Sequence, residues 1–261
     1  MFDILKIIKH QGKQYIPDPT KFVLPEQHAG KPIINIKECK NKCSLCKDIC
    51  PVNAITLLPI SLNMGSCVFC SECESICPVQ KIKFTSDYKI ASNNSDCLII
   101  QEGTEQEIKF DASFIRKEIK RCFGKSLKLR LVSAGSCNGC ELELNAAGNV
   151  NFDMGRYGIE FLASPRHCDG VVVTGPIVEN SIDALKSTFE AIPQPKIVIL
   201  AGSCAISGGI LNGSKAINRE FLKRQKPDLL IPGCPPHPLT FINGTIIKNA
   251  RRNRLTIVLA L

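Results

Sequence analysis

Residues 67–78 read Cys-Val-Phe-Cys-Ser-Glu-Cys-Glu-Ser-Ile-Cys-Pro, so that cysteines recur after two, two and three residues and a proline closes the run. A related set stands upstream and consists of Cys39, Cys43, Cys46 and Cys50, followed by Pro51. Gaps of two residues let one short loop direct three thiolates toward a common centre. Two such loops so close together indicate that bound metal organises this part of the chain.

The downstream run has the spacing of the bacterial ferredoxin motif, in which the fourth cysteine of one run ligates the 4Fe-4S cluster of the other. We therefore assign two clusters. The ligands of the first are Cys39, Cys43, Cys46 and Cys77, and the ligands of the second are Cys50, Cys67, Cys70 and Cys73. The upstream run departs from the motif because three residues separate Cys39 from Cys43, which bulges the loop without removing a ligand.

A zinc site is the alternative, since zinc is also bound by Cys-x2-Cys pairs. Two complete runs of four cysteines, each closed by proline, favour iron-sulfur clusters over zinc. The sequence Cys-Pro-Val-Asn-Ala-Ile at 50–55 is echoed by Cys-Pro-Val-Gln-Lys-Ile at 77–82. This internal repeat indicates a duplicated half-domain.

Beyond residue 110 the pattern changes to short apolar runs that alternate with amphipathic segments. We expect strands at 127–132, 170–174, 196–200 and 229–231, and helices at 111–123 and 182–191. Strands rich in Val and Ile that alternate with helices predict a parallel sheet covered on both faces.

Four further cysteines directly follow these predicted strands. They are Cys137 and Cys140 in Gly-Ser-Cys-Asn-Gly-Cys (135–140), Cys204 in Ala-Gly-Ser-Cys (201–204), and Cys234 in Pro-Gly-Cys-Pro-Pro (232–236). Sites in open α/β sheets form at the carboxyl ends of the strands, so these four thiolates can converge on a third 4Fe-4S cluster. The segment 174–176 (Thr-Gly-Pro) ends another strand at the same edge, either as a wall of the site or as a simple turn.

The residues quoted so far resemble a known family. The stretches at 135–143, 164–167 (Ser-Pro-Arg-His), 173–176 and 231–236 are similar to the small subunit of energy-converting (group 4) NiFe hydrogenases, a family that includes the B subunit of respiratory complex I. The resemblance covers about residues 112–248. The amino-terminal part is similar to the polyferredoxin subunit of formate hydrogenlyase, so the chain looks like a fusion of two subunits. Two residues separate Cys137 from Cys140, as in the hydrogenase branch, whereas complex I relatives carry adjacent cysteines there.

The resemblance implies that Cys137, Cys140, Cys204 and Cys234 bind the cluster nearest to a catalytic metal held by a separate large subunit. The chain would then be the iron-sulfur subunit of an oxidoreductase complex. It would pass electrons through three 4Fe-4S clusters to or from a NiFe site that reduces protons or oxidises hydrogen. The segment 205–233 is shorter than in that family, which implies a trimmed contact with the large subunit. The alternatives are a complex I-like relay without nickel that serves a quinone or another acceptor, and a freestanding ferredoxin-type carrier.

The expected organisation is an α+β two-cluster ferredoxin domain with an amino-terminal extension at residues 1–95, a linker at 96–111, and an α/β flavodoxin-like domain with a mostly parallel sheet at 112–261. The first ten residues predict a short amphipathic helix. This helix either caps its own domain or docks onto a membrane subunit.

Composition narrows the setting of the chain. The net charge of +9 is spread in short groups, Trp is absent and no base-stacking motif occurs, so nucleic-acid binding is not expected. No apolar run approaches the ~20 residues of a spanning helix. Fifteen cysteines without a secretory signal indicate a reducing compartment. We expect a cytoplasmic chain at the inner face of the cell membrane, with a hydrogenase-type large subunit, integral membrane subunits and an electron-donor protein as partners.

A few residues fit none of these patterns. Cys97, Cys122 and Cys168 have no cluster spacing, and the last two are interpreted as small core residues. For His167 three roles are considered, which are a proton relay, a contact with a partner and a structural hydrogen bond. Glu141 and Glu143 either tune the third cluster and bridge to the large subunit or begin a helix. With no nucleophile-base pair, phosphate loop or dinucleotide fingerprint, we expect no catalytic residue in this chain.

Overall fold

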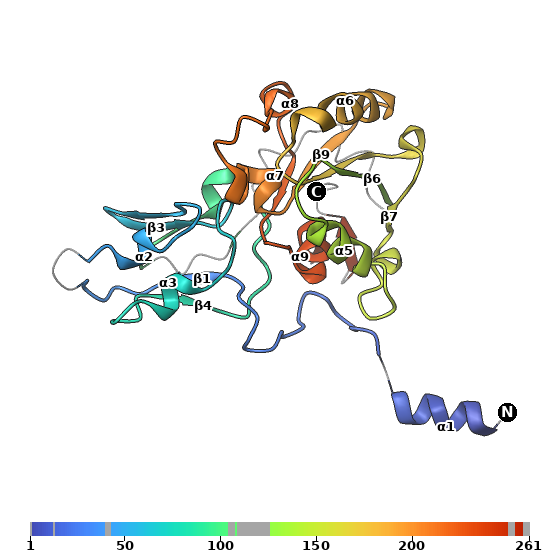
Figure 1. Ribbon diagram of the computed structural model, residues 1–261. Coiled ribbons are helices and arrows are strands. Elements are labelled where there is room, and N and C mark those ends of the chain that lie inside the picture. Colours follow the sequence, from blue (N-terminus) through green and yellow to red (C-terminus); the bar gives the residue numbers. More distant parts are fainter. Residues whose placement is uncertain are drawn as a thin grey trace.

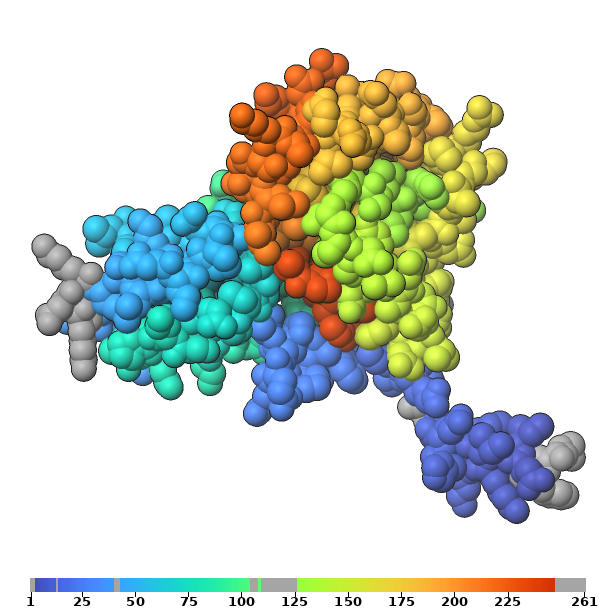
Figure 2. Space-filling model, viewed as in Figure 1, coloured from blue at the N-terminus to red at the C-terminus, as the bar shows by residue number. Residues whose placement is uncertain are grey.

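The computed structural model describes residues 2–12, 14–39, 43–103, 108, 126–249 and 254–257. An amino-terminal half with two small sheets lies beside a carboxy-terminal half built on a five-stranded sheet (Figure 1). Helix α1 (Phe2–Gln11), the amphipathic helix predicted at the start of the chain, stands away from both halves (Figure 2). The helix predicted at 111–123, and Cys122 with it, lies outside the described residues.

The large sheet is formed by β6 (Leu127–Ser133), β7 (Ile159–Phe161), β8 (Gly170–Thr174), β9 (Ile197–Ala201) and β10 (Leu229–Ile231). The strands lie in the order β10-β9-β8-β6-β7 and each neighbouring pair is parallel. In chain order this is 2-1-3-4-5, the order of flavodoxin-like doubly wound folds. The prediction of a mostly parallel α/β sheet is confirmed, whereas the edge strand β7 was not predicted.

Helices cover both faces of this sheet because alternate side chains of its buried strands point in opposite directions. Val171, Val173 and Leu200 share one buried cluster with residues of α6 (Ile182–Ala191) and α8 (Glu220–Arg224). Val172, Ile197 and Ile199 share another with residues of α5 (Gly139–Ala146) and α9 (Pro238–Thr245). The two-sided cover expected from the Val- and Ile-rich strands is therefore present.

The amino-terminal half repeats one backbone unit twice. In each copy a short helix, α2 (Leu45–Asp48) or α3 (Glu72–Ser75), leads through a cysteine and a proline to a strand, β2 (Ile55–Leu57) or β4 (Ile82–Phe84). Asn53 and Gln80 occupy matching positions with φ of 50° and 49°. β4 pairs antiparallel with β1 (Pro32–Ile34), and β2 pairs antiparallel with β3 (Ile60–Asn63). The sequence repeat thus has a structural counterpart, while the ferredoxin assignment of this half stays a prediction.

Part of the segment predicted as a linker, 96–111, belongs to the amino-terminal half. A 3-10 turn, η1 (Ser95–Leu98), leads into β5 (Ile99–Gln101), which pairs antiparallel with β3. The remaining short elements are η3 (Met154–Tyr157), η4 (Pro165–His167), η5 (Glu179–Ser181), α7 (Ser203–Ser207), η6 (Gly209–Leu211), β11 (Ile246–Asn249) and β12 (Arg254–Ile257). The domain boundaries themselves stay a prediction.

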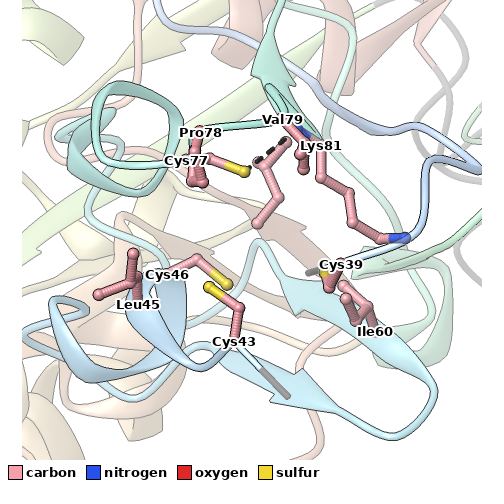
Figure 3. A pocket seen from close by; sticks show the side chains of 10 residues that line it. Cys39, Cys43, Leu45, Cys46, Ile60, Cys77, Pro78, Val79 and Lys81 are labelled. Carbon is pink, nitrogen blue, oxygen red and sulfur yellow. Dashed lines mark hydrogen bonds between the residues drawn. The ribbon is translucent and has the colours of Figure 1, made fainter. Parts of the chain in front are cut away.

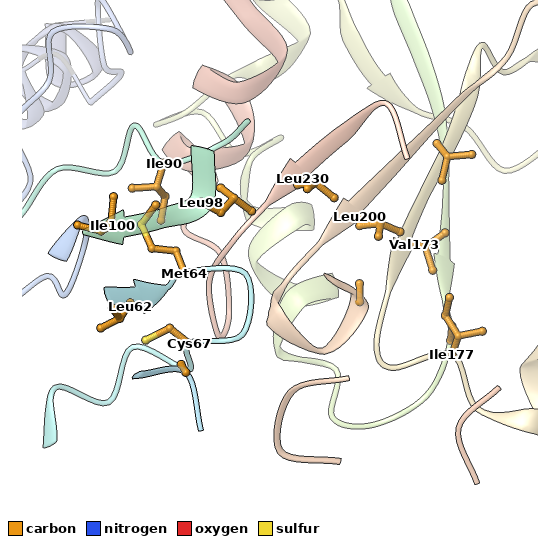
Figure 4. Packing of buried hydrophobic residues seen from close by; sticks show 14 of the residues in the cluster. Leu62, Met64, Cys67, Ile90, Leu98, Ile100, Val173, Ile177, Leu200 and Leu230 are labelled. Atoms are coloured by element: carbon orange, nitrogen blue, oxygen red, sulfur yellow. The ribbon is translucent and has the colours of Figure 1, made fainter. Parts of the chain in front are cut away.

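The two halves share a hydrophobic core. Leu62, Met64 and Leu98 of the amino-terminal half belong to the same buried cluster as Leu200 and Leu230 of the large sheet (Figure 4). Main-chain bonds cross the same junction, because Ser92 N donates to Leu230 O at 3.0 Å and Leu230 N donates to Ser92 O at 2.8 Å. The junction is therefore packed and hydrogen-bonded, not a loose tether.

The extension between α1 and β1 also ties the halves together. Ile16 N donates to Asn151 O at 2.8 Å, and the carbonyl oxygen of Pro19 accepts from Tyr88 Oη and from Asn243 Nδ2, each at 2.6 Å. Among the described residues, no helix is both long enough and apolar enough to cross a bilayer.

The shared core gives a stability prediction. Leu98 is 1% exposed and Leu58 is 96% exposed. Leu98→Ala leaves a cavity at the junction and should lower the free energy of unfolding by about 2 to 5 kcal/mol. Leu58→Ala, the matched control, should change it by less than about 0.5 kcal/mol. Urea unfolding of the anaerobically purified chain, followed by circular dichroism, measures both, and equal stabilities of the two variants would contradict the shared core.

Candidate metal centres

The first predicted ligand group surrounds one hollow. Cys39, Cys43, Cys46 and Cys77 line one small hollow (Figure 3). The other residues that line it are Leu45, Ile60, Pro78, Val79, Ile82 and Lys81. The structure thus brings together four thiols from two chain segments within a largely apolar wall, a donor set and a setting that fit a 4Fe-4S cluster.

The second predicted group lines a similar hollow. Its cysteines are Cys50, Cys67, Cys70 and Cys73, and apolar side chains such as Val52, Ile55, Leu62 and Phe84 complete the wall. Each hollow therefore takes its fourth cysteine from the other run, as the motif exchange predicts. Ligation itself stays a prediction for both groups.

Backbone amides point at three of these sulfurs. Ala54 N donates to Cys50 Sγ and Lys81 N donates to Cys77 Sγ, each at 3.3 Å and at matching positions of the repeat. Phe69 N donates to Cys67 Sγ, also at 3.3 Å. Hydrogen bonds to sulfur stabilise the thiolate and raise the potential of a cluster bound to it.

Burial opposes ionisation of these thiols when no metal is bound. It raises the pKa of Cys67 to about 12, against the opposing effect of the Phe69 amide, and the thiols of Cys73, Cys50 and Cys70 raise it further. It likewise raises the pKa of Cys73 to about 12, with Cys50 and Cys70 adding to the shift. Because a metal binds the thiolate, loading of this hollow must release protons.

The two copies of the repeat differ at one buried charge. Lys81 is 4% exposed and pairs through Nζ with Glu102 Oε1 at 2.6 Å and with the carbonyl oxygen of Lys37. The matching residue beside the second hollow is Ala54. The sequence repeat shows the difference between lysine and alanine, but only the structure shows that the lysine is buried and paired beside the first group.

The third group forms at the carboxyl edge of the large sheet. Cys137 and Cys140 follow β6, Cys204 lies on α7 directly after β9, and Cys234 follows β10. Cys140 is buried and Cys204 is half-buried, whereas Cys137 and Cys234 are exposed. The three loops thus meet at this edge, where two of the four cysteines are exposed.

Two glycines make this meeting possible. Gly202 has φ of +94°, and a Cβ there would lie 2.6 Å from Cys140 Sγ. Gly175 has φ of +76°, and a Cβ there would fall on the carbonyl oxygen of Gly135. The Thr174-Gly175-Pro176 turn is therefore packed against the Cys137 loop. A larger residue at either glycine would push the loops apart.

Charges and hydrogen bonds around the third group shift the pKa values of its thiols in different directions. Burial raises the pKa of Cys140 to about 12, and the Glu141 carboxylate and the other three thiols of the group add to the shift. Burial also raises the pKa of Cys204, while a hydrogen bond from the Ser136 side chain lowers it. Glu141 Oε1 accepts from Thr174 Oγ1 at 2.7 Å, and its Oε2 is buried without a hydrogen-bond partner among the described residues.

An arginine not predicted from the sequence anchors the helix that carries Cys204. Arg219 Nη2 donates to the carbonyl oxygens of Ala205 at 2.8 Å and Ile206 at 2.7 Å. This places a cation at the carboxyl end of α7, where carbonyl groups lack helical partners. No local motif marks Arg219, because its partners lie in a different element.

Cys168, Cys97 and His167, which the structure describes, are not among the residues of the three groups. Cys168 is 1% exposed in the shared core and donates through Sγ to the carbonyl oxygen of Ser164 at 3.3 Å. His167 is exposed and precedes β8, at the amino edge of the sheet. Cys97 is half-buried in η1. Glu143 lies on α5, and burial raises the pKa of its carboxyl group.

Within the described part of the chain, no three His, Cys, Asp or Glu side chains are grouped closely enough to hold a single metal ion. A 4Fe-4S cube carries its thiolates on separate irons, so its ligands stand farther apart than those of one ion.

Comparison with known proteins assigns the chain to a family. The sequence model of "NADH ubiquinone oxidoreductase, 20 Kd subunit" matches residues 137–247. The "Probable membrane-bound hydrogenase subunit mbhJ" of Pyrococcus furiosus is 33% identical over 156 residues, which cover 60% of this chain and 86% of that protein. The chain belongs to the family of the 20 Kd subunit.

Two further relatives are named as subunits of two different enzymes. "Formate hydrogenlyase subunit 7" of Escherichia coli is 37% identical over 128 residues, 49% of this chain and 49% of that protein. The B subunit of the NADH-quinone oxidoreductase of Citrifermentans bemidjiense is 34% identical over 108 residues, 41% of this chain and 62% of that protein. The family match contains all four cysteines of the third group, whereas the first two groups lie before it.

The third group gives a direct prediction. Cys204→Ala should remove one paramagnetic signal from the reduced protein and leave the other two, because all four cysteines of the third group come from the carboxy-terminal half. Cys168→Ala, the matched control for loss of a half-buried or buried thiol, should keep all three signals. Electron paramagnetic resonance of anaerobically reduced samples measures this. Loss of every signal in Cys204→Ala would show that the three groups do not load independently.

Proposed function

We propose that this chain is the electron-transfer subunit of a membrane-associated hydrogenase-type complex and passes electrons through three 4Fe-4S clusters. The main support for this proposal is that twelve cysteines gather into three separate groups, two around hollows and one at the carboxyl edge of the sheet. Bound clusters would supply one-electron oxidation and reduction. The chain's own residues would hold them in place and tune them by burial and hydrogen bonds.

The relatives support membership of a complex. The names of the Pyrococcus, Escherichia and Citrifermentans proteins describe subunits of a membrane-bound hydrogenase, of formate hydrogenlyase and of NADH-quinone oxidoreductase. We propose that this chain likewise assembles with a large subunit and with integral membrane subunits, and that an electron-donor protein meets its amino-terminal half. It would then lie at the inner face of the cell membrane without spanning it.

The open edge of the third group supports a large-subunit partner. Cys137 and Cys234 are exposed, and the neighbouring apolar side chains of Leu142 and Ile210 are 60% and 64% exposed. A cluster held there by this chain alone would face water. A partner that covers this edge would shield it and receive or supply its electrons, and we propose that the catalytic metal lies on that other chain.

Helix α1 supports attachment to membrane subunits. Ile4, Leu5, Ile7 and Ile8 are each more than half exposed, so α1 does not cap a core of its own chain as one sequence interpretation expected. An apolar helix face left without cover is suited to packing against another subunit. We propose that α1 docks onto a membrane subunit of the complex.

The hydrogenase function is favoured over the complex I-like function by one observation. Two residues separate Cys137 from Cys140, the spacing that is typical of the hydrogenase branch. The complex I-like relay, with a quinone or another acceptor and no nickel, is the second candidate. It is favoured by the similarity to the Citrifermentans NADH-quinone oxidoreductase protein.

The identity of the large subunit tests the proposal. Mild detergent extraction and affinity purification of the chain from its own cells should recover a large subunit that contains nickel and carries cysteine pairs able to bind it. Nickel is measured by elemental analysis of the purified complex. A large subunit without nickel would favour the second candidate, and a monomeric chain without any large subunit would contradict both.

The same purification has an internal control. Deletion of residues 2–11 should release the membrane subunits while the large subunit stays bound, because α1 and the third group lie on different parts of the molecule (Figure 1). Retention of the membrane subunits after the deletion would remove α1 from the docking surface.

A further inference from the structure

The second and third cysteine groups meet at one buried serine. Ser203 is 1% exposed and begins α7, directly before Cys204. Its hydroxyl lies 2.5 Å from the carbonyl oxygen of Cys67 and 3.2 Å from that of Gly233. Its backbone N–H donates to the same Gly233 oxygen at 2.9 Å. A hydroxyl has one proton, and the shorter distance assigns that proton to Cys67.

We propose that the Ser203 hydroxyl is the bridge through which electrons pass between the second and third clusters. The inference rests on the proposed three-cluster relay and deepens it by naming the residue that connects two of its members. Ser203 would touch neither cluster. It acts through Cys67 and Cys204, which makes it a positioning and coupling residue and not a ligand.

The bonded route between the two groups is continuous except for one hydrogen bond. From Cys67 Sγ it follows the side chain and backbone to the carbonyl oxygen, crosses the 2.5 Å hydrogen bond to Ser203 Oγ, and continues through the next peptide to Cys204 Sγ. Electronic coupling decays less steeply through bonds and short hydrogen bonds than across empty or water-filled space. A short hydrogen bond between buried groups is therefore an effective connection.

The competing route crosses a gap. Phe69 of the second group's loop and Cys234 of the third group line the same hollow. His28 and His237 also line it, with their ring centroids 5.3 Å apart. An electron that took this route would leave the bonded framework. The contrast favours the path through Ser203.

The position of Ser203 also orders the relay. Cys46 lies on α2 and Cys73 on α3, and these two helices contact each other, so the first and second groups are neighbours. Only the second group is bonded to the third through Ser203 among the described residues. In the proposed step one electron would pass between the second and third clusters, so that one would be oxidised as the other is reduced, with no bond broken and no proton moved.

Ser203 is not needed to hold the halves together. The paired hydrogen bonds between Ser92 and Leu230 and the shared core span the same junction. Removal of a single hydroxyl should therefore leave the separation of the clusters unchanged. This separates the coupling role of Ser203 from a purely structural one.

The test compares two serines of one short helix in the full chain loaded with its clusters. Ser203→Ala removes the bridge. Ser207→Ala is the matched control, because Ser207 Oγ donates only within the local turn, to the carbonyl oxygen of Ser203 at 3.0 Å. After a pulse of reductant, rapid-freeze paramagnetic resonance follows the appearance of the third-cluster signal. The dipolar coupling between the second and third clusters reports their separation in the same samples.

The expected result is a several-fold slower reduction of the third cluster in Ser203→Ala, at unchanged dipolar coupling, with Ser207→Ala at the wild-type rate. Ser203→Cys serves as a second variant if the alanine variant does not fold. Its thiol is a weak donor of similar size, and it should also slow the step. A wild-type rate in the Ser203 variants, or a slow rate accompanied by weaker dipolar coupling, would overturn the proposal. Absence of the third signal from the wild-type chain would instead sink the proposed relay.

Discussion

Parallel strands send the loops at their carboxyl ends to the same edge of a sheet, and the third cysteine group depends on this constraint. Cysteines that are far apart in sequence meet because β6, β9 and β10 all run in one direction. The constraint also fixes what the loops contain. Gly202 must lack a side chain because Cys140 Sγ occupies that space. The chemistry of the edge therefore follows from the topology of the sheet and from the absence of bulk at its turns.

The amino-terminal half is held against this edge by a shared core, and the attachment gives the cysteine groups a direction. Cys67 and Cys73 of the second group are buried, whereas Cys137 and Cys234 of the third are exposed. In the proposed relay the third group, with two exposed cysteines, would exchange electrons with a partner, and the other two groups would pass electrons within the chain. Cover by a partner would also shield the third cluster from water, which affects its potential.

Much of this arrangement could be predicted from the sequence because it is encoded locally. The motif spacing around Cys43 and Cys67 predicts both cysteine groups of the first half, and Val- and Ile-rich runs predict four of the five strands of the large sheet. Contacts between distant residues could not be predicted. Ser203 and Cys67 are separated by 136 positions, and nothing near Ser203 marks it as different from any other residue in a tight turn. The short edge strand β7 and the burial of Lys81 likewise depend on tertiary packing.

In the proposed relay one chain holds three iron-sulfur clusters, each in its own group of four cysteines. Anomalous diffraction at the iron absorption edge, from anaerobically grown crystals of the complex, tests it most directly. Three separate iron peaks are expected, two in the hollows of the amino-terminal half and one at the carboxyl edge of the large sheet beside Cys204. Iron at only two of these places, or a single zinc ion in any of them, would contradict it.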